Sequence, residues 1–149
     1  MLFDFLAIGY CLDRQSCRTL AATMVKLILV LLGGAVGTGF RYGAANLMVY
    51  ATGQIPKYPY ATFFVNITGS LLIGFLAELF DVRMQVSPEL RAALLVGVLG
   101  GYTTFSSLSF ETFNLMRDGK LGIAMLYSLG SLILGLTATW TGVRLAQMI

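Results

Sequence analysis

A cluster of hydroxyl side chains lies inside an otherwise apolar segment of this sequence. It follows the glycine pair Gly100-Gly101 and consists of Tyr102, Thr103, Thr104, Ser106, Ser107 and Ser109. Backbone that leaves a helix at membrane depth needs protein or a water-filled cavity to satisfy its hydrogen bonds, and transporters place ions at such breaks. This stretch is therefore the first candidate for a functional site.

The residues that follow have the spacing of a polar stripe on a helix. The stripe, at i, i+3, i+7 and i+10, contains Thr104, Ser107, Glu111 and Asn114. A neighbouring stripe contains Phe105, Leu108 and Thr112. Hydroxyl and amide donors can replace the water around a small anion, and the positive edge of an aromatic ring adds weak attraction. A cation path would favour a ring of carboxylates, and only Glu111 is available.

A second interpretation of the same side chains stays open. The hydroxyls can join neighbouring helices, and the phenylalanines can pack in a core. The Gly-Gly pair and the density of hydroxyls favour the ion pathway over this interpretation.

Composition places these side chains in a membrane. Of the 149 residues, 57% are hydrophobic and 11% are charged, whereas a soluble domain carries about a quarter charged residues. The net charge of +3 is spread over loops and ends, which leaves no basic patch for nucleic acid. The sequence has no histidine, the commonest general base and nitrogen ligand for metals. With no paired carboxylates on one face either, we do not expect an enzyme.

Four apolar runs predict an all-α membrane protein with four transmembrane helices. The expected spans are Leu27–Tyr50, Ala61–Phe80, Leu90–Met116 and Leu121–Val143. The first would reach about 36 Å, enough to cross a hydrocarbon core of about 30 Å with some tilt. The third is longer than a simple crossing, and we expect it to be broken at Gly100-Gly101.

Residues 1–23 are unlike the rest of the chain. Their apolar part, Phe3–Leu12, is too short to span a membrane, and a strong apolar run begins only after Met24. We therefore expect residues 1–23 to be an N-terminal extension, either disordered or a consequence of a mis-assigned start at Met1. The channel domain is expected to be residues 24–149.

The first two spans carry further candidate residues. Two small-xxx-small pairs, Gly33/Gly37 and Gly39/Gly43, would let another helix approach closely. A cation such as Arg41 inside a span has either a vestibule role or a structural one. Asn66 lies one turn inside the second span, with Thr62, Gly69, Ser70 and Ile73 on the same face.

Flanking charges give little preference for one orientation in the membrane. With a start at Met24, one side carries Lys26, Arg83, Arg91 and Arg144, and the other carries Lys57, Arg117 and Lys120. Such a weak bias predicts insertion in both orientations and hence an antiparallel homodimer. If residues 1–23 are present, Arg14 and Arg18 join the first side and strengthen the bias.

Three ordered motifs resemble the Fluc (CrcB) family of fluoride channels. They are Gly33-Gly34-Ala-Val-Gly37-Thr-Gly-Phe-Arg41-Tyr42, Tyr60-Ala-Thr62-Phe-Phe-Val-Asn66-Ile-Thr-Gly69 and Gly100-Gly101-Tyr-Thr103-Thr104-Phe105-Ser106. The resemblance covers the chain from Met24 to its end. It implies a dual-topology dimer with two fluoride pores in a bacterial or archaeal inner membrane. Such a dimer would export fluoride passively from the cytoplasm.

The resemblance also implies roles for individual residues. A structural sodium ion, which is not transported, would be bound at the dimer centre by the backbone carbonyls of Gly100 and Thr103. The pore-lining residues would be Asn66, Thr104, Phe105, Ser107, Glu111, Tyr127 and Ser131, with Arg41 as the first-span arginine. The family commonly has a second phenylalanine where this chain has Leu108. That departure predicts an altered conduction rate unless Phe110 compensates.

Two other functions are weighed against the channel. Small proton-coupled exporters with four helices and dual topology need a carboxylate in the first span, and Leu27–Tyr50 contains none. A structural membrane subunit without transport would leave cellular fluoride resistance unchanged after Asn66→Ala or Phe105→Ala.

Overall fold

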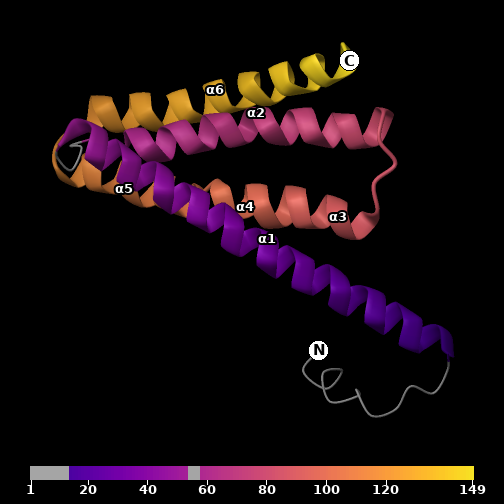
Figure 1. Cartoon of the computed structure of the whole chain (residues 1–149). Helices are drawn as coiled ribbons and strands as arrows, with labels where there is room; N and C mark the ends of the chain where they lie inside the picture. Colours follow the sequence, from indigo (N-terminus) through magenta and orange to yellow (C-terminus); the bar gives the residue numbers. More distant parts are fainter. Residues whose placement is uncertain (1–13, 54–57) are drawn as a thin grey trace.

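Helices are the only regular secondary structure in the residues that the computed structural model describes, which are 14–53 and 58–149. Four of its segments are long and apolar enough to cross a membrane: Cys17–Ala51, Tyr60–Val82, Pro88–Arg117 and Leu121–Gln147. The predicted all-α membrane fold with four spans is therefore confirmed. Three of the spans are continuous helices: α1 (Arg14–Thr52), α2 (Tyr60–Val82) and α6 (Leu121–Gln147). They run up and down in an elongated bundle in which α2 and α6 lie side by side (Figure 1).

The third span is divided into several helical pieces. It contains α3 (Pro88–Ala92), the π-helical turn η2 (Ala93–Val98), α4 (Leu99–Tyr102) and α5 (Phe105–Arg117). Ser87 caps its start, with its side chain accepting a hydrogen bond from the Leu90 N–H at 3.2 Å. Arg91 makes a bidentate ion pair with Asp81, which connects α3 to the end of α2.

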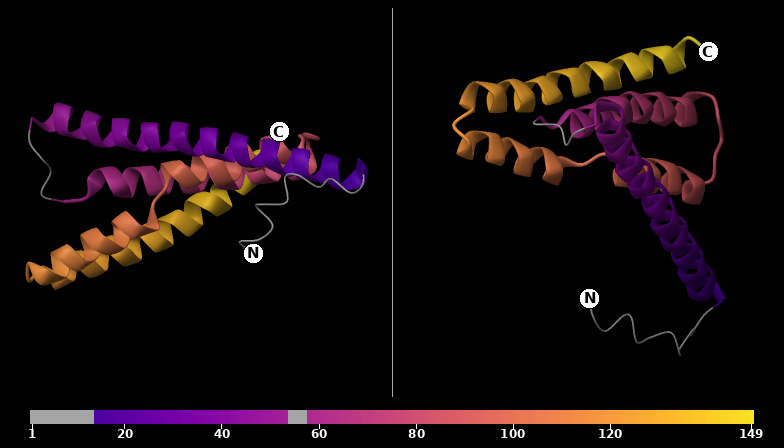
Figure 2. Two further views of the ribbon diagram at one scale, coloured as in Figure 1. Left: turned by 90° about the horizontal axis from the view of Figure 1, so that it is seen from below. Right: turned by 60° about the vertical axis from the view of Figure 1, so that its left-hand side comes forward.

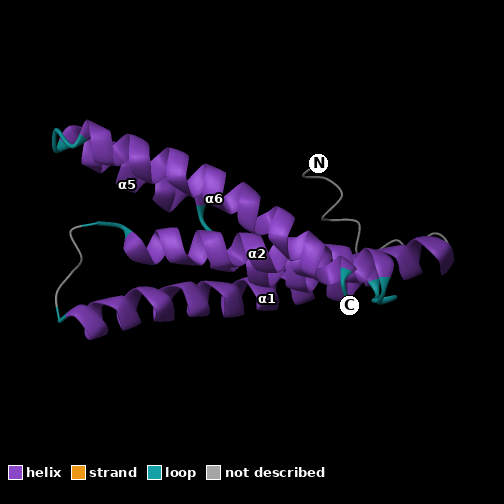
Figure 3. Cartoon of the chain, turned by 90° about the horizontal axis from the view of Figure 1, so that it is seen from above, coloured by secondary structure: helices purple, strands orange, loops and turns teal. Residues whose placement is uncertain are grey.

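The predicted break in the third span is confirmed, and its position is shifted. Gly100 and Gly101 are helical residues of α4, whereas Thr103 and Thr104 have extended backbone with ψ angles of 157° and 117°. Figures 2 and 3 show this break as a short connection between two offset helices. The glycines therefore do not unwind the helix themselves, and Gly101 has a packing role described next.

Glycines allow α1 to approach the third span at backbone contact. A Cβ on Gly101 would lie 2.5 Å from the Gly34 carbonyl oxygen, and one on Gly97 would lie 2.8 Å from the Val30 carbonyl oxygen. Side chains on Gly33 and Gly37 would likewise collide with the carbonyls of Ala93 and Val98. The predicted close approach at Gly33 and Gly37 is thus confirmed, because only glycine leaves room for the facing backbone.

The second predicted pair does not make such a contact. Cβ atoms on Gly39 and Gly43 would meet nothing within 4 Å in the described part of the chain. The prediction of a helix contact at this pair is therefore wrong within one subunit.

Helix α1 is longer than the expected first span. Its 39 residues correspond to about 58 Å, and its first turns extend away from the other helices (Figure 1). Residues 14–23 continue directly into the span, so α1 has no helix end at Met24. Residues 1–13 lie outside the described residues, and the boundary between extension and channel domain stays a prediction.

Candidate functional site

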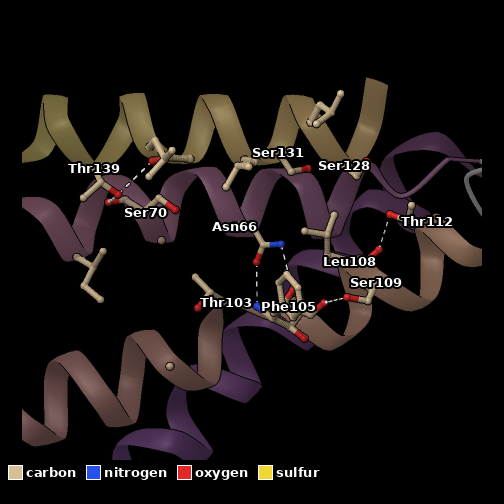
Figure 4. A pocket seen from close by; sticks show the side chains of 18 of the residues that line it. Asn66, Ser70, Thr103, Phe105, Leu108, Ser109, Thr112, Ser128, Ser131 and Thr139 are labelled. Carbon is tan, nitrogen blue, oxygen red and sulfur yellow. Dashed lines mark hydrogen bonds between the residues drawn. The ribbon is translucent and has the colours of Figure 1, made fainter. Parts of the chain in front are cut away.

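Asn66 on α2 binds the backbone of the break from both sides. Its Oδ1 accepts a hydrogen bond from the Thr104 N–H at 2.8 Å, and its Nδ2 donates to the Thr104 carbonyl at 3.2 Å. Figure 4 shows the amide pointing from α2 to the backbone just before Phe105. An amide carries one acceptor and a pair of donor hydrogens, so it can replace the two helical partners that the unwound residue lacks.

The same arrangement redirects hydrogen bonds away from two carbonyls. In a continuous α-helix the Thr104 N–H would donate to the Gly100 carbonyl, and the Ser107 N–H would donate to the Thr103 carbonyl. Instead, the Thr104 N–H donates to Asn66, and the Ser107 N–H donates to Thr104 Oγ1 at 3.2 Å. The break therefore releases the carbonyl oxygens of Gly100 and Thr103 from these helical bonds.

Thr104 connects the break to the polar stripe of α5. It is 8% exposed, and its hydroxyl caps α5 and lies 3.2 Å from the Ser107 hydroxyl and 3.1 Å from the Ser106 hydroxyl. Thr104 and Ser107 are thus brought together as the spacing predicts.

Further along the stripe, Glu111 binds hydroxyls from two neighbouring helices. Thr62 on α2 donates to Oε1 at 2.8 Å, and Tyr127 on α6 donates to Oε2 at 2.7 Å. Ser131, one turn along α6, is 6% exposed and donates to the Tyr127 carbonyl at 2.6 Å. The carboxylate therefore joins α2, α5 and α6 and fixes the direction of the hydroxyls beside it.

The second stripe of α5 lines an open groove between the broken third span and helices α2 and α6. The groove has a volume of about 790 Å³ and is lined by Asn66, Thr104, Phe105, Leu108 and Ser131, among others. Phe105 is 80% exposed, so its ring has little covering within one subunit. Ser109 and Thr112 also line the groove, but their hydroxyls donate to carbonyls of their own helix at 3.0 and 2.7 Å.

The residues of the predicted site therefore gather in two connected places. Asn66, Thr104 and Ser107 meet at the break, and Glu111 meets Tyr127 further along α5, with Ser131 beside them. Phe105 and Leu108 face the groove.

Two of the candidate residues lie apart from this gathering. Arg41, on α1, does not line the groove, and the described residues form ion pairs only between Arg91 and Asp81 and between Lys120 and Asp118. Phe110 is 66% exposed and is not among the groove residues, whereas Phe113 is. Phe110 is thus not positioned to replace the missing aromatic ring within the subunit.

Sequence reasoning did not assign functional roles to Thr62 and Phe63. Thr62 holds Glu111, and the Phe63 ring lies 6.4 Å from the Tyr127 ring, centroid to centroid. The signal for Thr62 was its position four residues before Asn66, on the same face of α2. Nothing in the spacing of Phe63 distinguishes it from ordinary apolar packing.

The comparisons with known proteins cover most of the chain. Residues 28–143 match the family model described as "CrcB-like protein, Camphor Resistance (CrcB)". A fluoride-specific ion channel FluC of Thermus thermophilus is 48% identical over 122 residues, which are 82% of this chain and 95% of that relative. The protein of the same name from Agrobacterium fabrum is 42% identical over 124 residues, covering 83% of this chain and 98% of that relative.

Proposed function

This chain belongs to the CrcB family, and from that membership we propose that it is a fluoride-selective ion channel through which fluoride leaves the cytoplasm passively. It is a multi-pass membrane protein, and the membrane we propose is the inner membrane of a bacterial or archaeal cell. Family membership also agrees with the expectation that the chain is not an enzyme.

The observation that carries this proposal is the row of oriented hydroxyls along α5. The hydroxyls of Thr104 and Ser107 meet at the break, and those of Thr62 on α2 and Tyr127 on α6 meet at Glu111 further along α5. A small anion gives up part of its water only where donors replace it. Glu111 accepts the hydroxyl hydrogens of Thr62 and Tyr127 and fixes their direction. Because each hydroxyl has one hydrogen, fluoride at this point would replace the carboxylate as their acceptor.

A structural sodium ion at the break is part of the proposal. The donor set fits a hard cation, which prefers oxygen ligands such as backbone carbonyls. The carbonyls of Gly100 and Thr103 would hold it, and both are released from helical bonding by Asn66 and the Thr104 hydroxyl. When bound, the ion would neutralise the carbonyl dipoles at the end of α4; it is not transported.

We propose that two antiparallel copies of this chain form the channel. The break beside the groove supports this arrangement, because backbone carbonyls released from helical bonding at membrane depth need protein or water next to them and cannot be satisfied by lipid. Gly100 is also exposed, so a second copy can bring its own carbonyls to the same ion. The remaining apolar surface would contact lipid.

Fluoride efflux from proteoliposomes tests the proposal. Vesicles loaded with potassium fluoride and containing the purified protein should release fluoride, detected with a fluoride electrode, when valinomycin removes the voltage that opposes flux. Chloride release should be much slower, and removal of sodium during purification should lower the fluoride flux. Equal release of the two anions would overturn the assignment.

The proton-coupled exporter remains disfavoured. Within the described spans, Glu111 is the carboxylate at the centre of the hydroxyl network, and both of its oxygens accept hydroxyl hydrogen bonds from neighbouring helices. A proton-coupled exporter would show uptake of a cationic drug driven by a pH gradient, which we expect to be absent here.

A further inference from the structure

Asn114 is the member of the polar stripe whose hydrogen bonding is incomplete. Its side-chain Oδ1 is buried and accepts no hydrogen bond from the described residues. Buried polar atoms without a partner are rare, and a bound water, an ion or a functional role usually explains them. The other three members, Thr104, Ser107 and Glu111, all have side-chain partners.

The position of Asn114 continues the row of polar groups toward the end of the membrane span. It lies three residues beyond Glu111, about 4.5 Å along the helix axis, and three residues before the end of α5 at Arg117. The next residue, Leu115, belongs to the buried cluster with Ala124 and Tyr127. Asn114 is therefore placed between the deep hydroxyl network and the charged turn that follows α5.

The charged groups of that turn offer a mixed environment to an anion. The Lys120 ammonium lies 5.7 Å from the centroid of the Tyr58 ring and 4.0 Å from the Asp118 carboxylate. The Lys120 N–H donates to the Leu115 carbonyl at 2.9 Å, which keeps this residue beside the last turn of α5. A neutral amide between Lys120 and Glu111 adds a donor without adding a second negative charge.

We propose that the Asn114 amide is the last side chain that hydrogen-bonds fluoride along the pathway. At this position the ion would leave its hydroxyl partners and regain water. The inference rests on the proposed channel function. A half-turn about the last side-chain bond brings the NH₂ group to the buried position now occupied by Oδ1, because the two ends of an amide have nearly the same shape. The side chain can thus donate to fluoride in one rotamer and accept from a hydrating water in the other.

The test compares fluoride efflux from proteoliposomes for the unchanged protein and for Asn114→Leu, Asn114→Ser and Asn114→Asp. Leucine has nearly the same volume but no hydrogen-bonding atoms, so we expect flux to fall about tenfold, the equivalent of one lost hydrogen bond. Asn114→Ser keeps a donor and should stay within about threefold of the unchanged protein. Asn114→Asp should lower flux more than leucine does, because a carboxylate offers no donor and its charge repels fluoride.

The control is Asn46→Leu, which changes an exposed asparagine on α1, outside the polar stripe of α5; its flux should be unchanged. Each variant is also checked for thermal stability and dimer content in detergent and for the sodium dependence of flux. The inference requires that all three stay as in the unchanged protein.

Flux of Asn114→Leu within twofold of the unchanged protein would overturn the inference, because the amide would then be a buried group without a transport role. Loss of the dimer or of stability together with flux would also overturn it, in favour of a structural role. If the unchanged protein released no fluoride, the proposed function itself would fail, and this inference with it.

Discussion

At the scale of single residues, Asn66 has the clearest structural task. It satisfies both backbone groups of Thr104, a residue that is only 8% exposed. Leaving such a group without a partner costs about 1–3 kcal/mol. The break in the third span is therefore held by a side chain of another helix, which makes Asn66 the link between α2 and α5.

We predict that Asn66→Leu and Asn66→Asp both lower fluoride flux strongly and both lower the unfolding temperature in detergent. Leucine leaves two backbone groups unpaired, whereas aspartate can still accept from the Thr104 N–H but presents an oxygen to the Thr104 carbonyl. Asn66→Asp keeps one hydrogen bond but places a partly buried charge against a carbonyl oxygen, so both variants should melt below the unchanged protein. Thermal melts and proteoliposome efflux measure both quantities. If Asn66→Leu melted at the temperature of the unchanged protein, the backbone contact would carry little energy.

Leu108 is the residue at which this chain departs from the resembled pattern, and it lines the groove next to Phe105. We predict that Leu108→Phe raises the ratio of fluoride to chloride flux several-fold, because the positive edge of an aromatic ring attracts a small anion. The matched control is Phe110→Leu, which removes an exposed ring outside the groove lining and should leave the ratio unchanged. If Leu108→Phe left the ratio of fluoride to chloride flux unchanged, this position would have no contact with the ion.

At the scale of helices, the sequence predicted the spans well and the break less well. Apolar runs were sufficient to place four helices, because such runs are local features. The unwound residues, Thr103 and Thr104, were not separable from the glycines before them by local pattern alone. Their conformation depends on Asn66, which lies 38 positions from Thr104 in the chain, and on Gly101, whose absent side chain admits α1.

In the candidate site too, contacts within one helix were predictable from the sequence, whereas contacts between helices were not. The spacing along α5 correctly grouped Thr104 with Ser107, since a helix period determines that contact. The pairing of Glu111 with Thr62 and Tyr127 joins three helices, so it depends on how the spans pack. The helix contacts of the Gly39/Gly43 pair were predicted by the same motif as those of Gly33/Gly37, and only packing distinguishes the two pairs.

This difference between the glycine pairs gives a prediction about helix packing. Gly37→Ala should lower the yield of folded protein and its melting temperature, because the new Cβ would collide with the Val98 carbonyl and lie 2.9 Å from the Tyr102 nitrogen. Gly43→Ala is the control, since its Cβ would meet nothing within 4 Å and alanine is the better helix former by about 1 kcal/mol. Size-exclusion profiles and melts in detergent compare the two. Equal behaviour of the variants would contradict the close approach of α1 to the third span.

At the scale of the whole molecule, the extended start of α1 bears on which way the chain crosses the membrane. Arg14 and Arg18 lie on the helix that continues into the first span, at the end of the bundle that also holds the α2–α3 turn and the C-terminus (Figure 1). Counting them, that end carries Arg14, Arg18, Lys26, Arg83, Arg91 and Arg144. The other flank, as predicted from the sequence, has Arg117, Lys120 and Lys57, the last of which lies outside the described residues. Positive charges favour the cytoplasmic side, so the full chain should prefer an orientation with its C-terminus inside.

We predict that deleting residues 1–23 shifts the protein toward insertion in both orientations, because the bias then falls to the four cations Lys26, Arg83, Arg91 and Arg144 against the same three. Fusions of the C-terminus to green fluorescent protein and to alkaline phosphatase, which report cytoplasmic and external locations, should show mainly the first signal for the full chain and comparable signals after the deletion. Arg14→Gln with Arg18→Gln in the full chain is the control for charge without a change of length, and it should reproduce the deletion. Since an antiparallel dimer needs both orientations, the same two variants should protect fluoride-sensitive cells better than the full chain does. Identical reporter ratios in all three proteins would mean that the cationic start of α1 has no influence on orientation.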